Sequence, residues 1–292
     1  MTDGKSERSE LDGRRRITRE LGAYFALAFA ISWGLGAAVI FFRPQFEAIV
    51  GPLGPLITSW PYYVAVCAPT ISAVLISLVF GGLNGVKNLF GGLVRPFKIQ
   101  WAFVALLTLA GGYAVWGIIE RSLSSTGIAS SVDFHALLVS APLLLFTTAN
   151  IFVDPGPWGE ETGWRGFALP RLLTKFRPLT AGLILGVIWG IWHTPAFLAS
   201  GLTQSGMNFG WFLIGSTCLT ILMTWIYVNA NGNYLVAGFI PHMMSNLLFS
   251  AHVVTNVRIE AIVFIVIVAA ILVVSGPGLV GMRFAQRMAV KA

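Results

Sequence analysis

Residues 155–166 read Pro-Gly-Pro-Trp-Gly-Glu-Glu-Thr-Gly-Trp-Arg-Gly and interrupt an otherwise strongly apolar sequence. They place two adjacent carboxylates, Glu160 and Glu161, and the guanidinium of Arg165 directly after a helix-interrupting Pro-Gly-Pro. An ionised carboxylate in hydrocarbon is costly, so such residues are candidates for a functional site. Glu161 and Arg165 are four residues apart and would neutralise each other on one helix face. Glu160 is left without a partner, and we expect that partner on another helix.

The composition places the rest of this chain in a membrane. Of its 292 residues, 56% are hydrophobic and 11% are charged, whereas soluble domains average about 25% charged residues. We therefore predict an all-α, polytopic integral membrane protein. The net charge of +7 fits basic cytoplasmic loops, and no nucleic acid partner is expected. Cys67 and Cys218 lie in apolar runs and indicate neither a disulfide framework nor a zinc cluster.

Apolar runs of about 20 residues, the length needed to cross a bilayer, follow a polar N-terminal segment. We expect residues 1–20 to be a disordered cytosolic tail and residues 21–292 to form a single membrane domain. The first run lacks a small-residue cleavage site, so it predicts a retained helix rather than a signal peptide. The pattern predicts about eight spans, at residues 21–42, 60–81, 101–120, 135–153 continuing into 158–173, 178–199, 208–229, 233–252 and 257–277.

Basic residues give the orientation of these spans. All 19 Lys and Arg residues except Arg43, Arg121 and Arg258 fall in the N-terminal tail, residues 85–100, the inner segment 165–177 or the C-terminal tail. Cytoplasmic loops carry such an excess, so both termini are predicted to be cytoplasmic. One of these loops, residues 85–100, has apolar side chains at helical spacing beside Lys and Arg. It predicts an amphipathic helix in the membrane interface.

Helix geometry brings Glu160 level with two histidines. A basic turn joins the fourth and fifth spans, and a rise of 1.5 Å per residue places Glu160 about 18 Å and His193 about 22 Å from that side. By the same rise, His242 lies about 14 Å and Asn246 about 20 Å deep in the seventh span. His242 and Asn246 are four residues apart and share a helix face. Four polar groups from three helices are therefore expected in one layer.

Other features of the sequence support a cavity at this layer. Pro195 and Pro241 lie beside the two membrane histidines, and a proline in a membrane helix frees a carbonyl that protein or water must satisfy. His135 and His252 fall at predicted helix ends, where an exposed imidazole needs no special partner. No nucleophilic Ser or Cys shares the layer with a base, because Ser245 is on a different helix face from His242. A covalent mechanism is therefore not expected.

Three short motifs in this layer resemble those of a known family. They are Glu160-Glu161-x-x-x-Arg165, Trp189-x-x-x-His193 and His242-x-x-x-Asn246, in this order. The set resembles the CAAX protease and bacteriocin-processing (CPBP, or Abi) family of intramembrane proteases, which includes the type II CAAX prenyl endopeptidases. The family usually has Phe at the position of Trp189 and often at that of Trp164. The resemblance covers about residues 135–252.

The resemblance implies hydrolysis of a peptide bond in a membrane-associated protein or peptide. Glu160 with His193 would position and deprotonate a water, and His242 with Asn246 would hold the oxyanion. The neighbouring carboxylate–guanidinium pair would anchor the helix. Glu160, His193 and His242 also match a three-ligand zinc site with an open fourth position. There is no His-Glu-x-x-His motif, and we favour a metal-independent site without a cofactor.

Two other classes of function use the same residues. A proton-coupled transporter would use the carboxylate and the two histidines as a relay. A non-catalytic membrane scaffold or immunity-type protein would keep the fold and bind peptides without cutting them. Prenylated proteins and membrane-bound precursors of small peptides both fit as protease substrates. The sequence specifies neither the natural substrate nor the oligomeric state.

Overall fold

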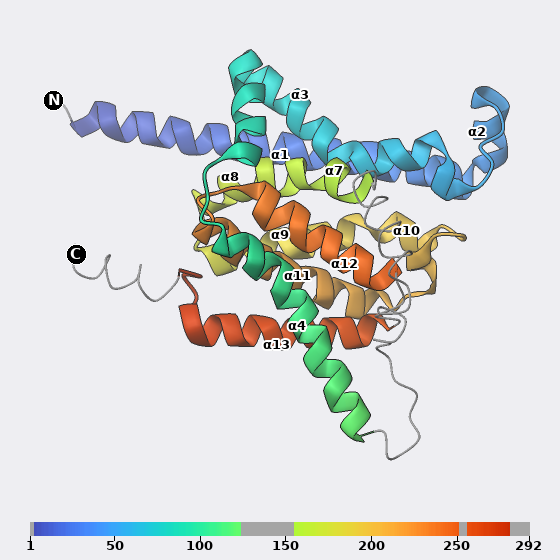
Figure 1. Ribbon diagram of the computed structural model, residues 1–292. Coiled ribbons are helices and arrows are strands. Elements are labelled where there is room, and N and C mark those ends of the chain that lie inside the picture. Colours follow the sequence, from blue (N-terminus) through green and yellow to red (C-terminus); the bar gives the residue numbers. More distant parts are fainter. Residues whose placement is uncertain (1–2, 124–154, 251–255, 281–292) are drawn as a thin grey trace.

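The computed structural model describes residues 3–123, 155–250 and 256–280. Across these ranges the chain forms helices and no strands, which confirms the all-α prediction (Figure 1). The α-helices are α1 (Asp3–Phe41), α2 (Arg43–Val50), α3 (Trp60–Gly91), α4 (Gln100–Leu123), α7 (Pro155–Glu161), α8 (Leu169–Leu173), α9 (Pro178–Trp192), α10 (Thr194–Leu198), α11 (Phe209–Asn229), α12 (Ile240–Ser250) and α13 (Val257–Ser275). Two π-helices, η4 (Thr162–Ala168) and η6 (Leu235–Phe239), and the short 3-10 helices η1 (Leu56–Thr58), η2 (Gly92–Val94) and η5 (Thr203–Gly206) complete these ranges.

Within the described ranges, five helical segments are long and apolar enough to cross a bilayer. They are Leu11–Phe41, Trp60–Val94, Pro178–Leu198, Phe209–Asn229 and Val257–Ser275. Each overlaps one of the predicted spans, so the protein is a multi-pass membrane protein.

The prediction of about eight spans is not confirmed. The predicted span 101–120 lies within α4, whose apolar part in the described residues, Gln100–Val115, is too short to count as a span. The span 233–252 is divided between η6 and α12. The segment 135–153, together with His135 and His252, lies outside the described residues. Eight therefore stays a prediction.

The N-terminal segment differs from the predicted disordered tail. α1 begins at Asp3 and continues without a break into the first span. The carboxylate of Glu20 binds Arg16 at 2.8 Å and Arg171 of α8 at 2.7 Å. The pair with Arg171 joins the end of this polar stretch to α8.

The loops gather at two opposite ends of the bundle (Figure 1). At the end near the N-terminus, hydrogen bonds join Thr18 to Lys175, Asn229 to Leu279, and Asn233 to Leu93 and Arg95. At the other end, the indole of Trp33 donates to the carbonyl of Trp192 at 3.0 Å. The first group consists of the loops predicted to be cytoplasmic, so the fold agrees with the predicted alternation of spans. The orientation of the bundle in the membrane stays a prediction.

The predicted amphipathic helix at 85–100 is shorter than expected. Gly82 has φ +60° inside α3, a conformation that favours glycine, and a second helical part follows it as far as Gly91. Leu89 of this part is buried and Phe90 is exposed, so these two apolar residues have different surroundings. The helix gives way to η2, and Arg95 is extended because the residue before a proline disfavours helical angles.

Glycines bring α9 close to α11. Gly182, Gly186 and Gly190 recur every four residues on α9, and a Cβ at Gly186 would lie 2.6 Å from the Cα of Thr217 on α11. Small residues at this spacing let two helix backbones approach closely. The contact fixes the depth and rotation of α9, and therefore the position of the residues at its C-terminal end.

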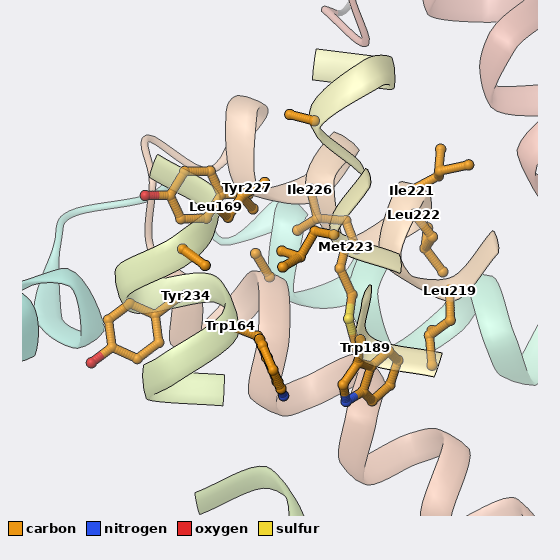
Figure 2. Close-up of a cluster of buried hydrophobic side chains, with 14 of the residues drawn as sticks. Trp164, Leu169, Trp189, Leu219, Ile221, Leu222, Met223, Ile226, Tyr227 and Tyr234 are labelled. Atoms are coloured by element: carbon orange, nitrogen blue, oxygen red, sulfur yellow. The ribbon is translucent and has the colours of Figure 1, made fainter. Parts of the chain in front are cut away.

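A core of large side chains surrounds this contact (Figure 2). It brings together residues of η4, α8, α9, α11 and η6 that are fully or almost fully buried. The residues labelled in Figure 2 are Trp164, Leu169, Trp189, Leu219, Ile221, Leu222, Met223, Ile226, Tyr227 and Tyr234. The core holds η4 and α9 in a fixed relation, so the motif residues that they carry face one another.

Candidate active site

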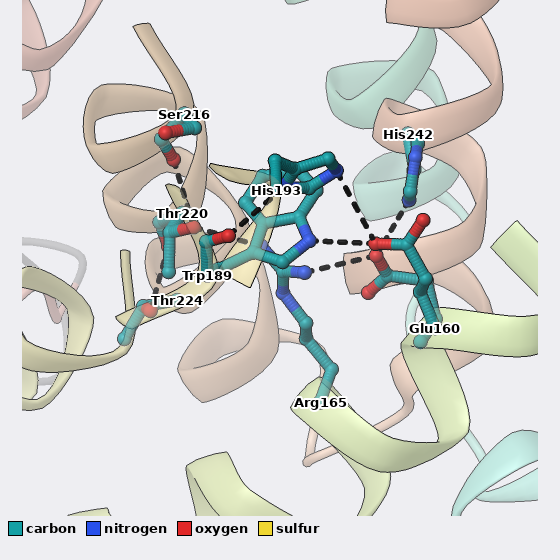
Figure 3. A network of polar contacts seen from close by, with 9 residues as sticks. Glu160, Arg165, Trp189, His193, Ser216, Thr220, Thr224 and His242 are labelled. Atoms are coloured by element: carbon teal, nitrogen blue, oxygen red, sulfur yellow. Dashed lines mark hydrogen bonds and ion pairs between the residues drawn. The ribbon is translucent and has the colours of Figure 1, made fainter. Parts of the chain in front are cut away.

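Glu160 points into the interior of the bundle from the last turn of α7. Its side chain is 5% exposed. Its Oε2 atom accepts a hydrogen bond of 2.6 Å from the indole N–H of Trp189 on α9 (Figure 3). The Nε2 atom of His193 lies 4.0 Å from the same oxygen. The partner that the sequence left unassigned for Glu160 therefore comes from α9.

The orientation of His193 follows from its second ring nitrogen. Nδ1 lies 2.9 Å from the carbonyl oxygen of Trp189, which can only accept a hydrogen bond, so we assign the proton to Nδ1. In the neutral ring, Nε2 then presents a lone pair towards Glu160. The 4.0 Å separation is longer than a direct hydrogen bond. Both groups therefore present acceptors to the same small space.

His242 is joined to the second carboxylate of the Glu-Glu pair. Its Nδ1 atom lies 2.7 Å from Oε1 of Glu161, and both side chains are almost completely buried. Gly238, one turn earlier, is closely packed here, since a Cβ at that position would overlap Oε2 of Glu161. Because the carboxylate accepts at Nδ1, the Nε2 atom of His242 is the one left for other chemistry.

Arg165 completes a buried polar network behind Glu160 and Glu161. Its side chain is 0% exposed and donates to Oε1 of Glu161 at 2.9 Å, so the ion pair expected from their spacing is present. A second N–H donates to Thr220 Oγ1 on α11 at 2.8 Å. The guanidinium lies over the ring of Trp189, 4.5 Å from its centroid. The network thus ties η4 to α9 and α11.

The four predicted site residues line one cavity. Glu160, His193, His242 and Asn246 all contribute to a cavity of about 230 Å³. Asn246 lies one helical turn beyond His242 on α12, as their spacing predicts. Much of the remaining wall is apolar and comes from residues 32–40 of α1 and 61–66 of α3. The cavity therefore combines a polar group at one wall with an apolar wall formed by α1 and α3.

Some site contacts were not evident from the sequence. The indole N–H of Trp189 and the pairing of His242 with Glu161 depend on helix rotation, which the spacing of motifs does not give. Thr220 could have been found, because Ser216, Thr220 and Thr224 form a polar stripe at four-residue spacing in an apolar helix. In the structure the hydroxyl of Thr220 donates to the carbonyl of Ser216 at 2.9 Å, leaving its oxygen to accept from the guanidinium.

Whether the site binds zinc stays a prediction, which the described residues do not decide. They contain no group of three or more His, Cys, Asp and Glu side chains arranged to hold a metal ion. One nitrogen of His193 bonds a backbone carbonyl and one nitrogen of His242 bonds Glu161, an arrangement that metal-ligating histidines also have. Glu160 and His193 are close enough to share a small molecule such as water, and the mechanism proposed below uses protein groups and water.

Comparison with known proteins gives the same family as the motifs. Residues 139–248 match the family model for type II CAAX prenyl endopeptidase Rce1-like proteins. Over 153 residues the chain is 26% identical to CAAX prenyl protease 2 of Methanococcus maripaludis, an alignment that covers 49% of this chain and 51% of the relative. The chain therefore spans about half the length of this curated relative. The matched region contains all three motifs, so residues 139–248 are similar to the type II CAAX prenyl endopeptidases in the same segment that carries the motif resemblance.

Proposed function

We propose that this protein is an intramembrane endopeptidase of the CAAX protease type, which hydrolyses a peptide bond in a membrane-associated protein or peptide. One observation carries the proposal: Glu160 and His193 face each other across 4.0 Å in a cavity that His242 and Asn246 also line. A scaffold would have no need for two acceptors aimed at one point. The network around Arg165 is consistent with this role because it holds both carboxylates in place.

The first step is attack by water. A water molecule donates one hydrogen to Glu160 and the other to Nε2 of His193, which leaves an oxygen lone pair for the substrate carbonyl. As the new C–O bond forms, one proton passes from the water to Glu160. The carbonyl oxygen becomes the oxyanion of a tetrahedral intermediate. His193 keeps the water in line because its Nδ1–H is held by the carbonyl of Trp189.

Stabilisation of the oxyanion is assigned to His242 and Asn246. The imidazolium form of His242 donates from Nε2, while Glu161 accepts from Nδ1 and balances its charge. The side-chain amide of Asn246 supplies a second donor from the same helix face. Loss of one such donor typically lowers kcat by about 10²–10³-fold.

Collapse of the intermediate returns the proton. The C–N bond breaks as protonated Glu160 gives its proton to the departing amine. The products are a carboxylic acid and an amine, and Glu160 is again a carboxylate. No group other than water is consumed.

The substrate class is tested directly. The archaeal relative is named a CAAX prenyl protease, so we propose a prenylated peptide with a C-terminal CAAX sequence as the first substrate and an unprenylated, membrane-anchored peptide as the second. Cleavage would be measured in proteoliposomes by mass spectrometry. The wild type is compared with Glu160→Gln and His193→Ala, and Glu47→Gln serves as a carboxylate control outside the cavity.

The expected result is cleavage by the wild type and Glu47→Gln and a loss of at least about 10²-fold in both site variants. A chelator should leave the rate unchanged. Loss of activity with the chelator and its return with zinc would overturn the metal-free mechanism. Absence of wild-type cleavage with both substrates, together with proton-driven uptake of a solute, would replace the protease by a transporter.

A further inference from the structure

A second carboxylate, Glu260, lines the same cavity and has no part in the mechanism above. It lies in the first turn of α13, and its side chain is partly exposed. Its Oε1 atom accepts from the hydroxyl of Ser245 at 3.0 Å and from the hydroxyl of Tyr113 at 3.3 Å. These two donors, on α12 and α4, hold the carboxyl group in one orientation. Both act on the same oxygen.

No cation of the described chain neutralises Glu260. The described residues that line the cavity include two carboxylates and two imidazoles but neither Lys nor Arg. Arg165 is fully buried in the network with Glu161. Arg258, two residues before Glu260, is exposed and lies over the ring of Trp211. A carboxylate in such a wall is costly unless a charge is paired with it.

We propose that Glu260 binds a basic side chain, Lys or Arg, of the peptide substrate. Within the described part of the chain, Oε2 receives no hydrogen bond, so it is the atom that faces an incoming ammonium or guanidinium group. The ligand would supply the positive charge that the cavity wall lacks. This inference rests on the proposed protease function and assigns a preference to the same cavity.

The position of Glu260 determines how far from the scissile bond the basic residue of the substrate lies. Ser245 is three residues from His242 and adjacent to Asn246, the two proposed oxyanion donors. It lines the cavity with them, so the expectation that Ser245 lies on a different helix face was wrong. Residues three or four apart on a helix are about 5–6 Å apart, and an extended peptide advances about 3.3 Å per residue. A peptide held at the oxyanion donors would therefore place a residue within about three positions of the scissile bond next to Glu260.

The experiment uses pairs of membrane-anchored peptides that differ at one residue. Each of the three positions on either side of the scissile bond carries Lys in one peptide and norleucine in the other, because norleucine keeps the length of the side chain without its charge. kcat/KM is measured for the wild type, Glu260→Gln and Glu260→Asp in proteoliposomes. Glu47→Gln is the control for loss of a carboxylate elsewhere.

We expect the wild type to prefer Lys to norleucine at one position by about tenfold or more, since a hydrogen bond to a charged group gives discrimination of this size. Glu260→Gln still accepts from Ser245 and Tyr113, and it should lose the preference while cleaving the norleucine peptide within about twofold of the wild type. Glu260→Asp should keep part of the preference.

Three results would overturn the inference. Equal cleavage of Lys and norleucine peptides by the wild type at every position would exclude a cation subsite while leaving the protease function intact. An equal loss of kcat/KM on the Lys and norleucine peptides in Glu260→Gln would make Glu260 a structural anchor for α12, whether or not the variant protein is folded. Cleavage of no peptide by the wild type would remove the proposed function as well.

Discussion

Trp189 gives Glu160 a hydrogen bond that the phenylalanine usual in the family cannot form. The indole N–H is the only hydrogen-bond donor of this side chain, and it lies 2.6 Å from Oε2 of Glu160. The ring also packs against both histidines, with centroids 5.4 Å from each. Trp189 is therefore a positioning residue that orients the proposed base.

Trp189→Phe separates these two roles, because it keeps an aromatic ring and removes the N–H. We expect kcat to fall by about tenfold or more with little change in KM, since hydrogen bonds to charged groups contribute about 1.5–3 kcal/mol. Steady-state kinetics in proteoliposomes measure this. The matched control is Trp225→Phe, since the indole N–H of Trp225 has no acceptor in the described chain. A Trp189→Phe enzyme with wild-type kcat would show that Glu160 is oriented without it.

Thr220 is predicted to matter for stability through Arg165. Thr220→Val preserves the shape of the side chain but leaves one guanidinium N–H of Arg165 without its 2.8 Å acceptor. A buried donor without an acceptor costs about 1–3 kcal/mol or more when charged, so the thermal unfolding temperature in detergent should fall clearly. Thr224→Val is the control, because the hydroxyl of Thr224 donates only to a carbonyl of its own helix. Equal unfolding temperatures for the two variants would contradict the prediction.

At the scale of elements, the close contact of α9 with α11 sets the geometry of the site. Gly186→Ala should lower both the unfolding temperature and the activity, because its Cβ would lie 2.6 Å from the backbone of Thr217. Overpacking of this kind costs about 1–3 kcal/mol. Gly34→Ala on α1, where a Cβ meets no atom within 4 Å, should be neutral or stabilising, as alanine favours the helix. Differential scanning fluorimetry on the two variants checks this, and no loss in Gly186→Ala would refute it.

The spacing and depth of the helices could be predicted from the sequence, but their rotation could not. The turn near Lys175 and the ion pair of Glu161 with Arg165 follow from composition and spacing, and both are present. Helix depth could be counted, but rotation about each axis depends on packing between distant segments. For this reason the contact of His242 with Glu161, 81 residues apart, had no signal in the motifs. The π-helices η4 and η6, which adjoin the site, were not foreseen either, although such segments often occur at functional sites.

For the whole molecule, the described fold agrees with alternating spans, while the orientation is a prediction from basic residues. Single cysteines at Asp12 and Pro277 should be protected from a membrane-impermeant thiol reagent in intact cells, and cysteines at Pro52 and Thr203 should be labelled. Cys67 and Cys218 would first be replaced by alanine. Labelling of position 12 or 277 from outside would reverse the orientation or change the number of spans.

The wall that α1 contributes to the cavity has a consequence for comparisons among relatives. Residues 32–40 form that wall, yet the family match begins at residue 139. Homologues that share the reactive groups are therefore free to diverge in this wall, which would face the lipid group of the proposed prenylated substrate. Under the proposed function, exchanging the first forty residues between two such homologues should transfer the preference for one lipid group of the substrate over another. It should not change the residues that cleave the peptide bond.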